Sequence, residues 1–273
     1  MKIGFCFLVY DTVRHPGVWK EFFENGDDDD FEIISHIKKP NEKTPRWLQS
    51  ARVKSTKTRH CGFGLVAAHL QMIRKCLLLK CTHCVLLSQD CIPLWYKDDI
   101  LKKIKHVERS MFAGTHSEDF EDAMSDVGGI SYMTSQWCIL TRDGMVNYLK
   151  IEDTESGKQW RLQMDKKLSN FYKTEKLQRC PDEQYPASFL HHIYGESEFA
   201  NHVEIPGPVT YVHWYDSNDM SPTPMTIPVA RKIRRKLMRV NEEWLFVRKA
   251  YKSAVPILAF ASSKARKKDD SHK

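Results

Sequence analysis

Two adjacent acids, Asp182 and Glu183, follow Pro181 and precede an apolar run near the middle of the C-terminal half. A carboxylate held beside a substrate hydroxyl can accept its proton while the oxygen attacks an electrophilic carbon. Acids also favour the first turn of a helix, so either residue could cap a helix that runs through residues 189–193. The two roles are compatible, because one acid can cap the helix while the other reacts.

Basic residues concentrate at the C-terminal end of the chain. From Pro228 onward there are 14 Lys/Arg and 4 Asp/Glu, whereas the preceding residues carry 28 basic and 31 acidic side chains within a net charge of +7. An anionic ligand should therefore contact this segment. Nucleic-acid binding is one reading, but few aromatics are interleaved, no binding motif is present and the rest of the chain is acidic. We expect no nucleic-acid partner.

Sequence motifs for other common binding or catalytic sites are absent or incomplete. The sequence has no G-x-G-x-x-G, no G-x-x-x-x-G-K-[ST] and no G-x-S-x-G, which argues against dinucleotide, P-loop and α/β-hydrolase sites. Cys81-x-x-Cys84 lacks a second pair at zinc-finger spacing, so we interpret it as two packed thiols at the start of a strand. The run Asp27–Asp30 is interpreted as a solvated loop. Without a signal peptide, the eight cysteines are expected to be reduced.

The hydrophobic pattern of the first half predicts alternating strands and helices. Three strands connected through helices imply a mostly parallel sheet, and ligands gather at the carboxyl ends of such strands, where Asp90 stands. No repeat or Gly/Ser linker divides the 273 residues, so we expect one domain with a basic C-terminal extension. The predicted elements are strands over 3–10, 31–37 and 84–88 and helices over 18–23 and 65–77.

Several short motifs occur in a fixed order along the chain. They are Trp19 with Phe22 and Phe23, Leu86-Leu87-Ser88-x-x-Cys91-Ile92-Pro93-Leu94, Ser135-Gln136-Trp137, Pro181-Asp182-Glu183-x-Tyr185, Thr210-Tyr211-Val212-x-Trp214, and Phe246-x-Arg248-Lys249. In this order the chain resembles the core-2/I-branching β-1,6-N-acetylglucosaminyltransferase family, and especially its plant and microbial branch, which is related to the xylosyltransferases. The resemblance extends over roughly residues 3–252.

The resemblance implies an α/β fold of the GT-A type over residues 1–255, with a mostly parallel central sheet flanked by helices. The donor half would span about 1–145 and the acceptor half about 146–255, with residues 256–273 as a basic, mobile tail. It also implies inverting transfer of a sugar, GlcNAc or xylose first, from a UDP-sugar to a hydroxyl of a glycan acceptor. The acid of the P-D-E motif maps onto Glu183 as general base, with Asp182 in a supporting role.

The leaving diphosphate needs positive charge. We find no D-x-D motif at a strand end, and the family is similar in using an Arg and a Lys from its C-terminal part, so no metal or other cofactor is expected. Lys249 matches the lysine best, with Arg248 beside it. The arginine could be Arg231, Arg234 or Arg235, although that cluster could equally be a solvated helix face. A metal-using enzyme of the same fold is the alternative.

The same resemblance suggests contacts with the sugars and the base. Gln136 and Trp137 would lie near the donor or acceptor sugar, although Trp137 could belong to the core. Trp214 would stand beside the acceptor or simply pack, and Asp90 would contact the donor. Val9 and Tyr10 would border the nucleotide base.

One segment departs from the family pattern. Cys61-Gly62-Phe63-Gly64 stands where members have an aromatic residue, then Gly or Ser, then Trp. No apolar run reaches the length of a membrane anchor, which favours a soluble, cytoplasmic enzyme of a bacterial or viral type. A catalytically inactive glycan- or nucleotide-binding homologue is the alternative, but Glu183 and Lys249 together argue against it. The oligomeric state stays open.

Overall fold

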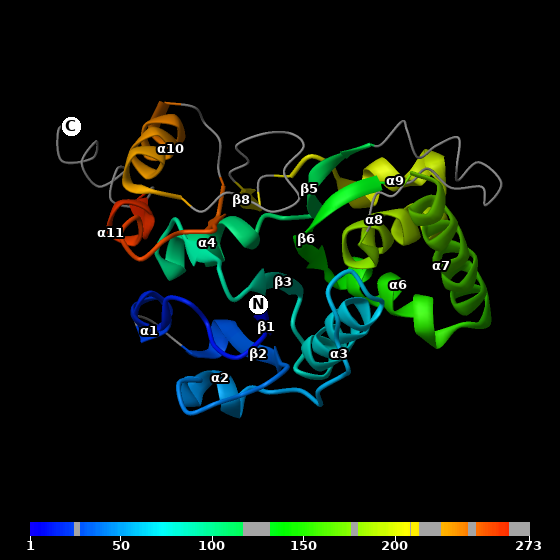
Figure 1. The fold of residues 1–273 in the computed structure, drawn as a ribbon, viewed down its shortest axis with the longest axis horizontal. Helices are drawn as coiled ribbons and strands as arrows, with labels where there is room; N and C mark the ends of the chain where they lie inside the picture. Colours follow the sequence, from blue (N-terminus) through cyan, green and yellow to red (C-terminus); the bar gives the residue numbers. More distant parts are fainter. Residues whose placement is uncertain are drawn as a thin grey trace.

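A six-stranded sheet forms the centre of the computed structural model, which describes residues 1–24, 28–116, 132–175, 180–207, 209–212, 225–239 and 244–261 (Figure 1). The strand order is β2-β1-β3-β6-β5-β7. β1 pairs in parallel with both β2 and β3, β6 runs antiparallel to both of its neighbours, and β5 pairs in parallel with β7. The strands are β1 Ile3–Val9, β2 Phe31–Ile37, β3 His83–Ser88, β5 Ser110–His116, β6 Tyr132–Thr141 and β7 Val203–Glu204.

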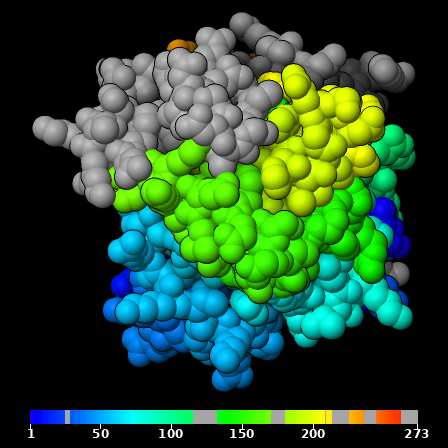
Figure 2. Space-filling model, turned by 90° about the vertical axis from the view of Figure 1, so that its right-hand side faces the viewer, coloured from blue at the N-terminus to red at the C-terminus, as the bar shows by residue number. Residues whose placement is uncertain are grey.

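Helices cover both faces of this sheet. In Figure 1, α1, α4, α10 and α11 lie on the left and α3, α6, α7 and α8 on the right. Figure 2 views the right-hand side, where the green surface of α6 and α7 lies between the light-blue N-terminal part and the yellow region around α9. The helices are α1 Pro16–Glu24, α2 Arg46–Ser50, α3 Gly64–Leu78, α4 Lys97–Ile104, α6 Arg142–Asp153, α7 Glu155–Glu175, α8 Pro181–Tyr194, α9 Glu196–His202, α10 Ile227–Arg239 and α11 Val255–Leu258, with a 3-10 turn η1 at Asp28–Asp30.

The two-residue period of the strands sorts their side chains between two cores. In β1, Phe5 and Phe7 belong to the core under α1 and α4, whereas Cys6 faces the core under α3, α6 and α8. β3 follows the same rule, with Leu87 on the first side and Cys84 on the second. A strand that is apolar throughout is therefore explained by burial on both faces, as the parallel arrangement requires.

A small second sheet of order β4-β9-β8 lies beside the carboxyl end of β3. β9 runs antiparallel to β4 and parallel to β8. Its strands are β4 Ile92–Pro93, β8 Thr210–Val212 and β9 Phe246–Arg248. This sheet brings the C-terminal part of the chain back to the end of a strand of the first half.

The sequence predicted this architecture correctly. All five elements predicted for the first half are present as β1, α1, β2, α3 and β3, with ends shifted by at most a few residues. The mixed α/β arrangement with a mostly parallel sheet confirms the fold class expected for a GT-A-like domain. None of the described helices is both long and apolar enough to cross a membrane.

The folded part of the chain extends beyond residue 256, where the sequence predicted the start of the mobile tail. Leu258 and Phe260 are buried, and the Phe260 ring stacks on Tyr96 with centroids 4.6 Å apart. Their apolar side chains gain more from burial than from solvation, so this stretch belongs to the fold. Residues 262–273 of the predicted tail lie outside the described residues.

The expectation that all cysteines are reduced is wrong for one pair. Cys61, before α3, forms a disulfide with Cys180, before α8, across a sequence separation of 119 residues. The fold brings the two loops together, which no local pattern around either cysteine could indicate. The other six cysteines are free and buried.

Removing this disulfide should destabilise the protein. A cross-link across so long a loop restricts the unfolded chain, and such links typically contribute about 2–5 kcal/mol. We expect Cys61→Ser/Cys180→Ser to lower the free energy of unfolding in urea by that amount. Equal stability of the double variant and the wild type under non-reducing conditions would contradict the cross-link.

The run Asp27–Asp30 is consistent with the predicted solvated turn. Asp30 accepts a hydrogen bond from Lys105 Nζ at 3.0 Å and lies 3.8 Å from the N-terminal ammonium. The acid is thus paired with cations of the chain itself, and Asp27 lies outside the described residues.

Candidate active site

The ends of β1 and β3 are joined by hydrogen bonds through Gln89. The Tyr10 amide donates to Gln89 Oε1, and the Arg14 amide donates to the Gln89 carbonyl oxygen, both at 2.9 Å. Arg14 Nε lies 3.5 Å from Asp90 Oδ1. Asp90 is therefore held at the carboxyl end of the sheet, where ligands of open α/β folds bind.

The pairing of β4 with β9 explains how Arg248 and Lys249 come to lie near Asp90. Ile92 lies opposite Val247 in this antiparallel pair. Asp90 precedes the paired residue Ile92 and Lys249 follows the paired residue Val247, and the charge of Asp90 acts on both Arg248 and Lys249. Two cations from the end of the chain thus meet an acid that precedes them by more than 150 residues.

Arg248 is a buried cation stacked on an aromatic ring. Arg248 is only 8% exposed, and its guanidinium carbon lies 3.7 Å from the centroid of the Trp137 ring. Burial lowers the pKa of Arg248, while Cys91, Asp90 and Glu183 act against that shift. Its Nε is buried and makes no hydrogen bond within the described part of the chain. The stacking and the two nearby carboxylates keep the guanidinium charged and fixed.

Lys249 adds a second, more accessible positive charge. Burial and the charge of Arg248 lower the pKa of Lys249, and the Asp90 carboxylate opposes them. The two adjacent cations raise the local potential, which favours an anion with two negative charges over one with a single charge. Such a pair is suited to a diphosphate.

Glu183 enters this group from the first turn of α8. The cap of the helix is the backbone of Cys180, whose carbonyl oxygen accepts a hydrogen bond from the Glu183 amide at 2.9 Å. Thr134 Oγ1 of β6 donates to the Glu183 carbonyl oxygen at 3.3 Å. The Glu183 side chain is half-buried, and its charge acts on Arg248 and on Asp182.

The Asp182 side chain, unlike that of Glu183, is fully buried in the core. It is 1% exposed, and its Oδ1 has no hydrogen-bond partner among the described residues. Burial, reinforced by the Glu183 charge, raises the pKa of Asp182 to about 7. The pKa of Asp182 thus lies near neutral pH, because the folded protein favours the protonated form of this acid.

The raised pKa of Asp182 predicts a stability that falls as pH rises. The unfolded side chain titrates near 3.9, so between about pH 4 and 7 the folded state holds a proton that the unfolded state has lost. That contribution is complete below about pH 4 and is lost as pH rises through 7. At pH 8 we expect the free energy of unfolding of Asp182→Asn to exceed that of the wild type by up to about 4 kcal/mol. The variant should therefore unfold at a higher urea concentration.

Urea unfolding of both proteins at pH 5 and pH 8 measures this effect. The advantage of Asp182→Asn should be clearly smaller at pH 5. A difference between the two proteins that does not change with pH would show that Asp182 titrates normally in the fold.

The structure describes most of the other predicted contacts. Val9 is buried at 2% exposure, while the neighbouring Tyr10 is 49% exposed, with the ammonium groups of Lys38 and Lys39 at 5.5 and 5.9 Å from its ring centroid. Gln136 is half-buried, and Trp137 is 5% exposed within the core. One face of the Trp137 ring is covered by Arg248. Trp214 lies outside the described residues.

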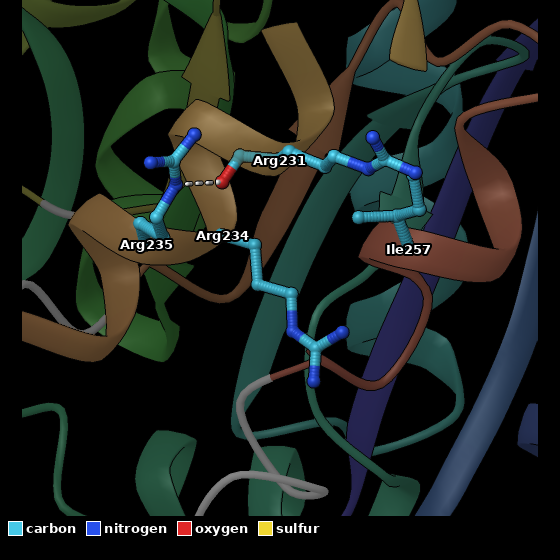
Figure 3. A pocket seen from close by; sticks show the side chains of 4 residues that line it. All are labelled: Arg231, Arg234, Arg235 and Ile257. Atoms are coloured by element: carbon cyan, nitrogen blue, oxygen red, sulfur yellow. Dashed lines mark hydrogen bonds between the residues drawn. The ribbon is translucent and has the colours of Figure 1, made fainter. Parts of the chain in front are cut away.

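Three of the arginines of α10 line a separate pocket. Arg231, Arg234, Arg235 and Ile257 of α11 enclose about 370 Å³, and none of the residues around Asp90 contributes to it. In Figure 3 the side chains leave the helix in different directions, with Arg231 extending toward Ile257, and Arg235 Nε donates to the Arg231 carbonyl oxygen at 3.3 Å. The structure thus groups Arg248 and Lys249 with the carboxylates, and the α10 arginines with one another.

Sequence reasoning missed three residues that organise the site. Arg14 pairs with Asp90, Gln89 joins the two strand ends, and His15 Nε2 donates to the Ala250 carbonyl oxygen at 2.7 Å, next to Lys249. Burial lowers the pKa of His15, which favours its neutral form. All three stand within five residues of the end of a predicted strand, and that position was the available signal.

A comparison with protein families identifies the family of the chain. Residues 3–240 match the family described as Core-2/I-Branching enzyme. Among curated proteins, no sequence matches significantly. The match extends over most of the chain and includes β1, β3, β6 and α8, but it ends before Arg248 and Lys249. The chain therefore belongs to the core-2/I-branching enzyme family, whose members are glycosyltransferases.

Proposed function

We propose that this protein transfers a sugar from a UDP-sugar to a hydroxyl of a glycan acceptor, with inversion at the anomeric carbon and without a metal ion. GlcNAc and xylose are the first donor sugars to test. The observation that supports the proposal best is the grouping of two carboxylates, Glu183 and Asp90, with the Arg248 guanidinium, which is followed directly by Lys249 at the carboxyl end of the sheet.

Glu183 acts as the general base in this scheme. The acceptor hydroxyl gives its proton to the Glu183 carboxylate as its oxygen forms a bond to the anomeric carbon, and the bond from that carbon to the diphosphate breaks. Attack opposite the leaving group inverts the configuration in a single displacement. Only one enzyme carboxylate is needed, which is consistent with the buried position of Asp182.

Arg248 and Lys249 stabilise the diphosphate as negative charge develops on it. Fixed cations are most effective where water is excluded and where they need no reorganisation during the reaction. Arg248 meets both conditions, because it is buried and stacked on Trp137. Trp137 thus acts as a positioning residue for Arg248, and Asp90 is proposed to contact the donor sugar from its ion pair with Arg14.

The α10 arginines are a second candidate for the phosphate contact. Arg231, Arg234 or Arg235, which line a pocket of their own, would then supply it. The exposed Tyr10, with Lys38 and Lys39 nearby, is proposed to stack on the nucleotide base. Trp214 is proposed to lie beside the acceptor.

The function is tested by measuring UDP release from a panel of UDP-sugars, with and without EDTA. We expect one donor to be consumed at the same rate in EDTA, and no acceleration when Mg²⁺ or Mn²⁺ is added to the EDTA-treated enzyme in excess. A strict need for Mn²⁺ would contradict the metal-free scheme. If no donor is consumed and no nucleotide raises the melting temperature, the chain is a binding protein that has retained the fold.

A further inference from the structure

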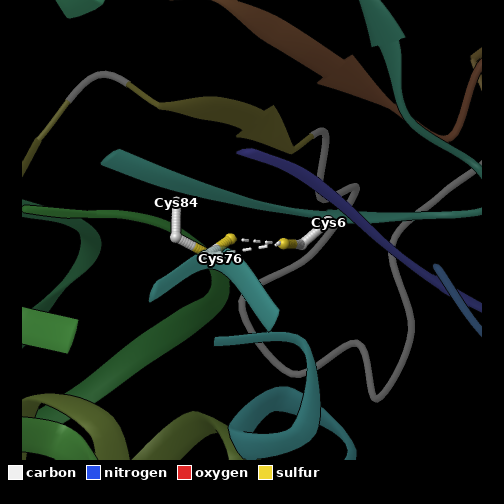
Figure 4. A group of neighbouring side chains, drawn as sticks. All are labelled: Cys6, Cys76 and Cys84. Atoms are coloured by element: carbon white, nitrogen blue, oxygen red, sulfur yellow. Dashed lines mark hydrogen bonds between the residues drawn. The ribbon is translucent and has the colours of Figure 1, made fainter. Parts of the chain in front are cut away.

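Four buried cysteines gather between the sheet and α3. Cys6 lies in β1, Cys76 in α3, Cys84 in β3 and Cys81 in the turn that joins the last two elements, and all four are 0% exposed. The Cys6 sulfur lies 3.4 Å from the sulfurs of both Cys76 and Cys84. Figure 4 shows the three thiols of Cys6, Cys76 and Cys84 pointing toward one another, with the dashed lines converging on Cys6.

The neighbouring backbone leaves room for this sulfur cluster. Gly4 of β1 has no Cβ, and a Cβ there would collide with the Cys76 sulfur and lie 3.5 Å from the Cys81 sulfur. Cys81 is therefore close to Cys76, and it contributes a fourth sulfur. The Cys81-x-x-Cys84 pair, which the sequence suggested to be two packed thiols, joins two more cysteines from elsewhere in the chain.

The sulfurs of the cluster are in hydrogen-bond contact. The Cys84 thiol donates to the Cys6 sulfur at 3.4 Å. Cys138, a buried thiol on the next strand, is not a member of this group of sulfurs. A thiolate is the form of cysteine that binds metals, so an ion bound here would replace the protons of the coordinating thiols.

We propose that Cys6, Cys76, Cys81 and Cys84 form a binding site for a soft, thiophilic cation, either Zn²⁺ or Cu⁺. Thiolate ligands select these ions over the hard cations Mg²⁺ and Ca²⁺. On binding, each coordinating thiol releases its proton to solvent and its sulfur forms a bond to the ion. The site is independent of the proposed transfer reaction.

Three of the four sulfur positions fit such an ion with little movement. A tetrahedral Zn²⁺ about 2.3 Å from each ligand holds sulfurs about 3.8 Å apart. The sulfurs of Cys6, Cys76 and Cys84 all lie within 4.8 Å of one another, with two separations of 3.4 Å. The Cys81 sulfur lies outside this group of three, so the Cys81 side chain would have to turn toward the ion to supply the fourth ligand.

The bound ion would stabilise the fold and would not take part in catalysis. It would join β1, α3 and β3, whose packing forms the donor half of the domain. Cys84 precedes Ser88, at the carboxyl end of β3, by four residues, or about 13 Å along a strand. The ion would therefore lie well away from the cations and carboxylates of the candidate active site.

The experiment measures metal content and thermal stability of the full chain. Protein freed of metal under reducing, anaerobic conditions is mixed with Zn²⁺, with Cu⁺ or with Mg²⁺, desalted and analysed. We expect about one Zn²⁺ or Cu⁺ per chain and a higher melting temperature, by mass action on the folded state, and no effect of Mg²⁺. Comparison of the sample mixed with Zn²⁺ and the sample mixed with Cu⁺ shows which ion binds more tightly.

Variants separate the cluster from other buried thiols. Cys84→Ser and Cys76→Ser should each weaken binding by at least about tenfold, since even loss of an outer-shell partner costs that much. Cys138→Ser removes a buried thiol outside the cluster and should bind like the wild type. Because a cluster variant could fold poorly, the wild type carries an independent test, in which bound metal must slow the reaction of the cluster thiols with an alkylating reagent.

Three results would overturn the proposal. The first is metal content near zero for both soft ions in folded wild-type protein. The second is binding that Cys138→Ser weakens as much as Cys84→Ser does. The third is a chain in which two of the six free cysteines form a disulfide even under reducing conditions.

Discussion

Glu183→Gln should abolish sugar transfer while leaving donor binding intact. The amide is close in size to the carboxylate but cannot accept the acceptor proton, so we expect kcat to fall about 10²–10⁴-fold. The substitution also removes a negative charge near Arg248, which that charge helps to keep protonated. UDP affinity should therefore be unchanged or slightly tighter. Steady-state kinetics with the preferred donor and calorimetric titration with UDP measure the two effects separately.

Glu196→Gln is the matched control for this variant. Glu196 also lies in the first turn of a helix, α9, but is exposed and outside the site. The same change of charge there should leave kcat as in the wild type. Turnover of Glu183→Gln close to that of the wild type would remove Glu183 as the base, and an equal loss in both variants would point to a general effect of charge.

Lys249→Ala should weaken donor binding and slow the chemical step together. Its ammonium is proposed to contact the diphosphate both before and during departure, when the negative charge on the leaving group increases. Removal of one such fixed group typically lowers kcat about 10²–10³-fold. We expect kcat to fall in this range and KM for the donor to rise, with a smaller loss for Lys249→Arg, which retains the charge.

Lys252→Ala provides the comparison for Lys249→Ala. Lys252 is exposed three residues further along the chain, so its removal changes the net charge equally without touching the site. Unchanged kinetics for Lys249→Ala would move the phosphate contact to the α10 pocket. Arg231→Ala and Arg234→Ala would then be the variants with the large effect.

The strands of the first half and their parallel arrangement could be predicted from local sequence. Each strand of the first half is a short apolar run, and connections through helices leave a parallel arrangement as the favoured one. Phe5 and Cys6 show why the faces could not be assigned as readily, because a strand buried on both sides carries no polar face to mark its orientation.

The candidate residues could be named from the sequence, but the residues that contact them could not. The ordered motifs indicated Asp90, Glu183 and Lys249, yet the stacking of Arg248 on Trp137 depends on the pairing of β9 with β4. That pairing joins residues about 150 positions apart and leaves no local signal. The disulfide between Cys61 and Cys180 and the four-cysteine cluster arise from the same kind of long-range contact.

The most direct test of the proposed mechanism follows transfer by NMR, in EDTA, from the α-linked UDP-sugar that the donor panel selects. The account predicts that wild-type enzyme forms a β-linked product without added metal and that Glu183→Gln forms none over the same period. An α-linked product, or transfer that begins only after Mn²⁺ is added, would contradict it.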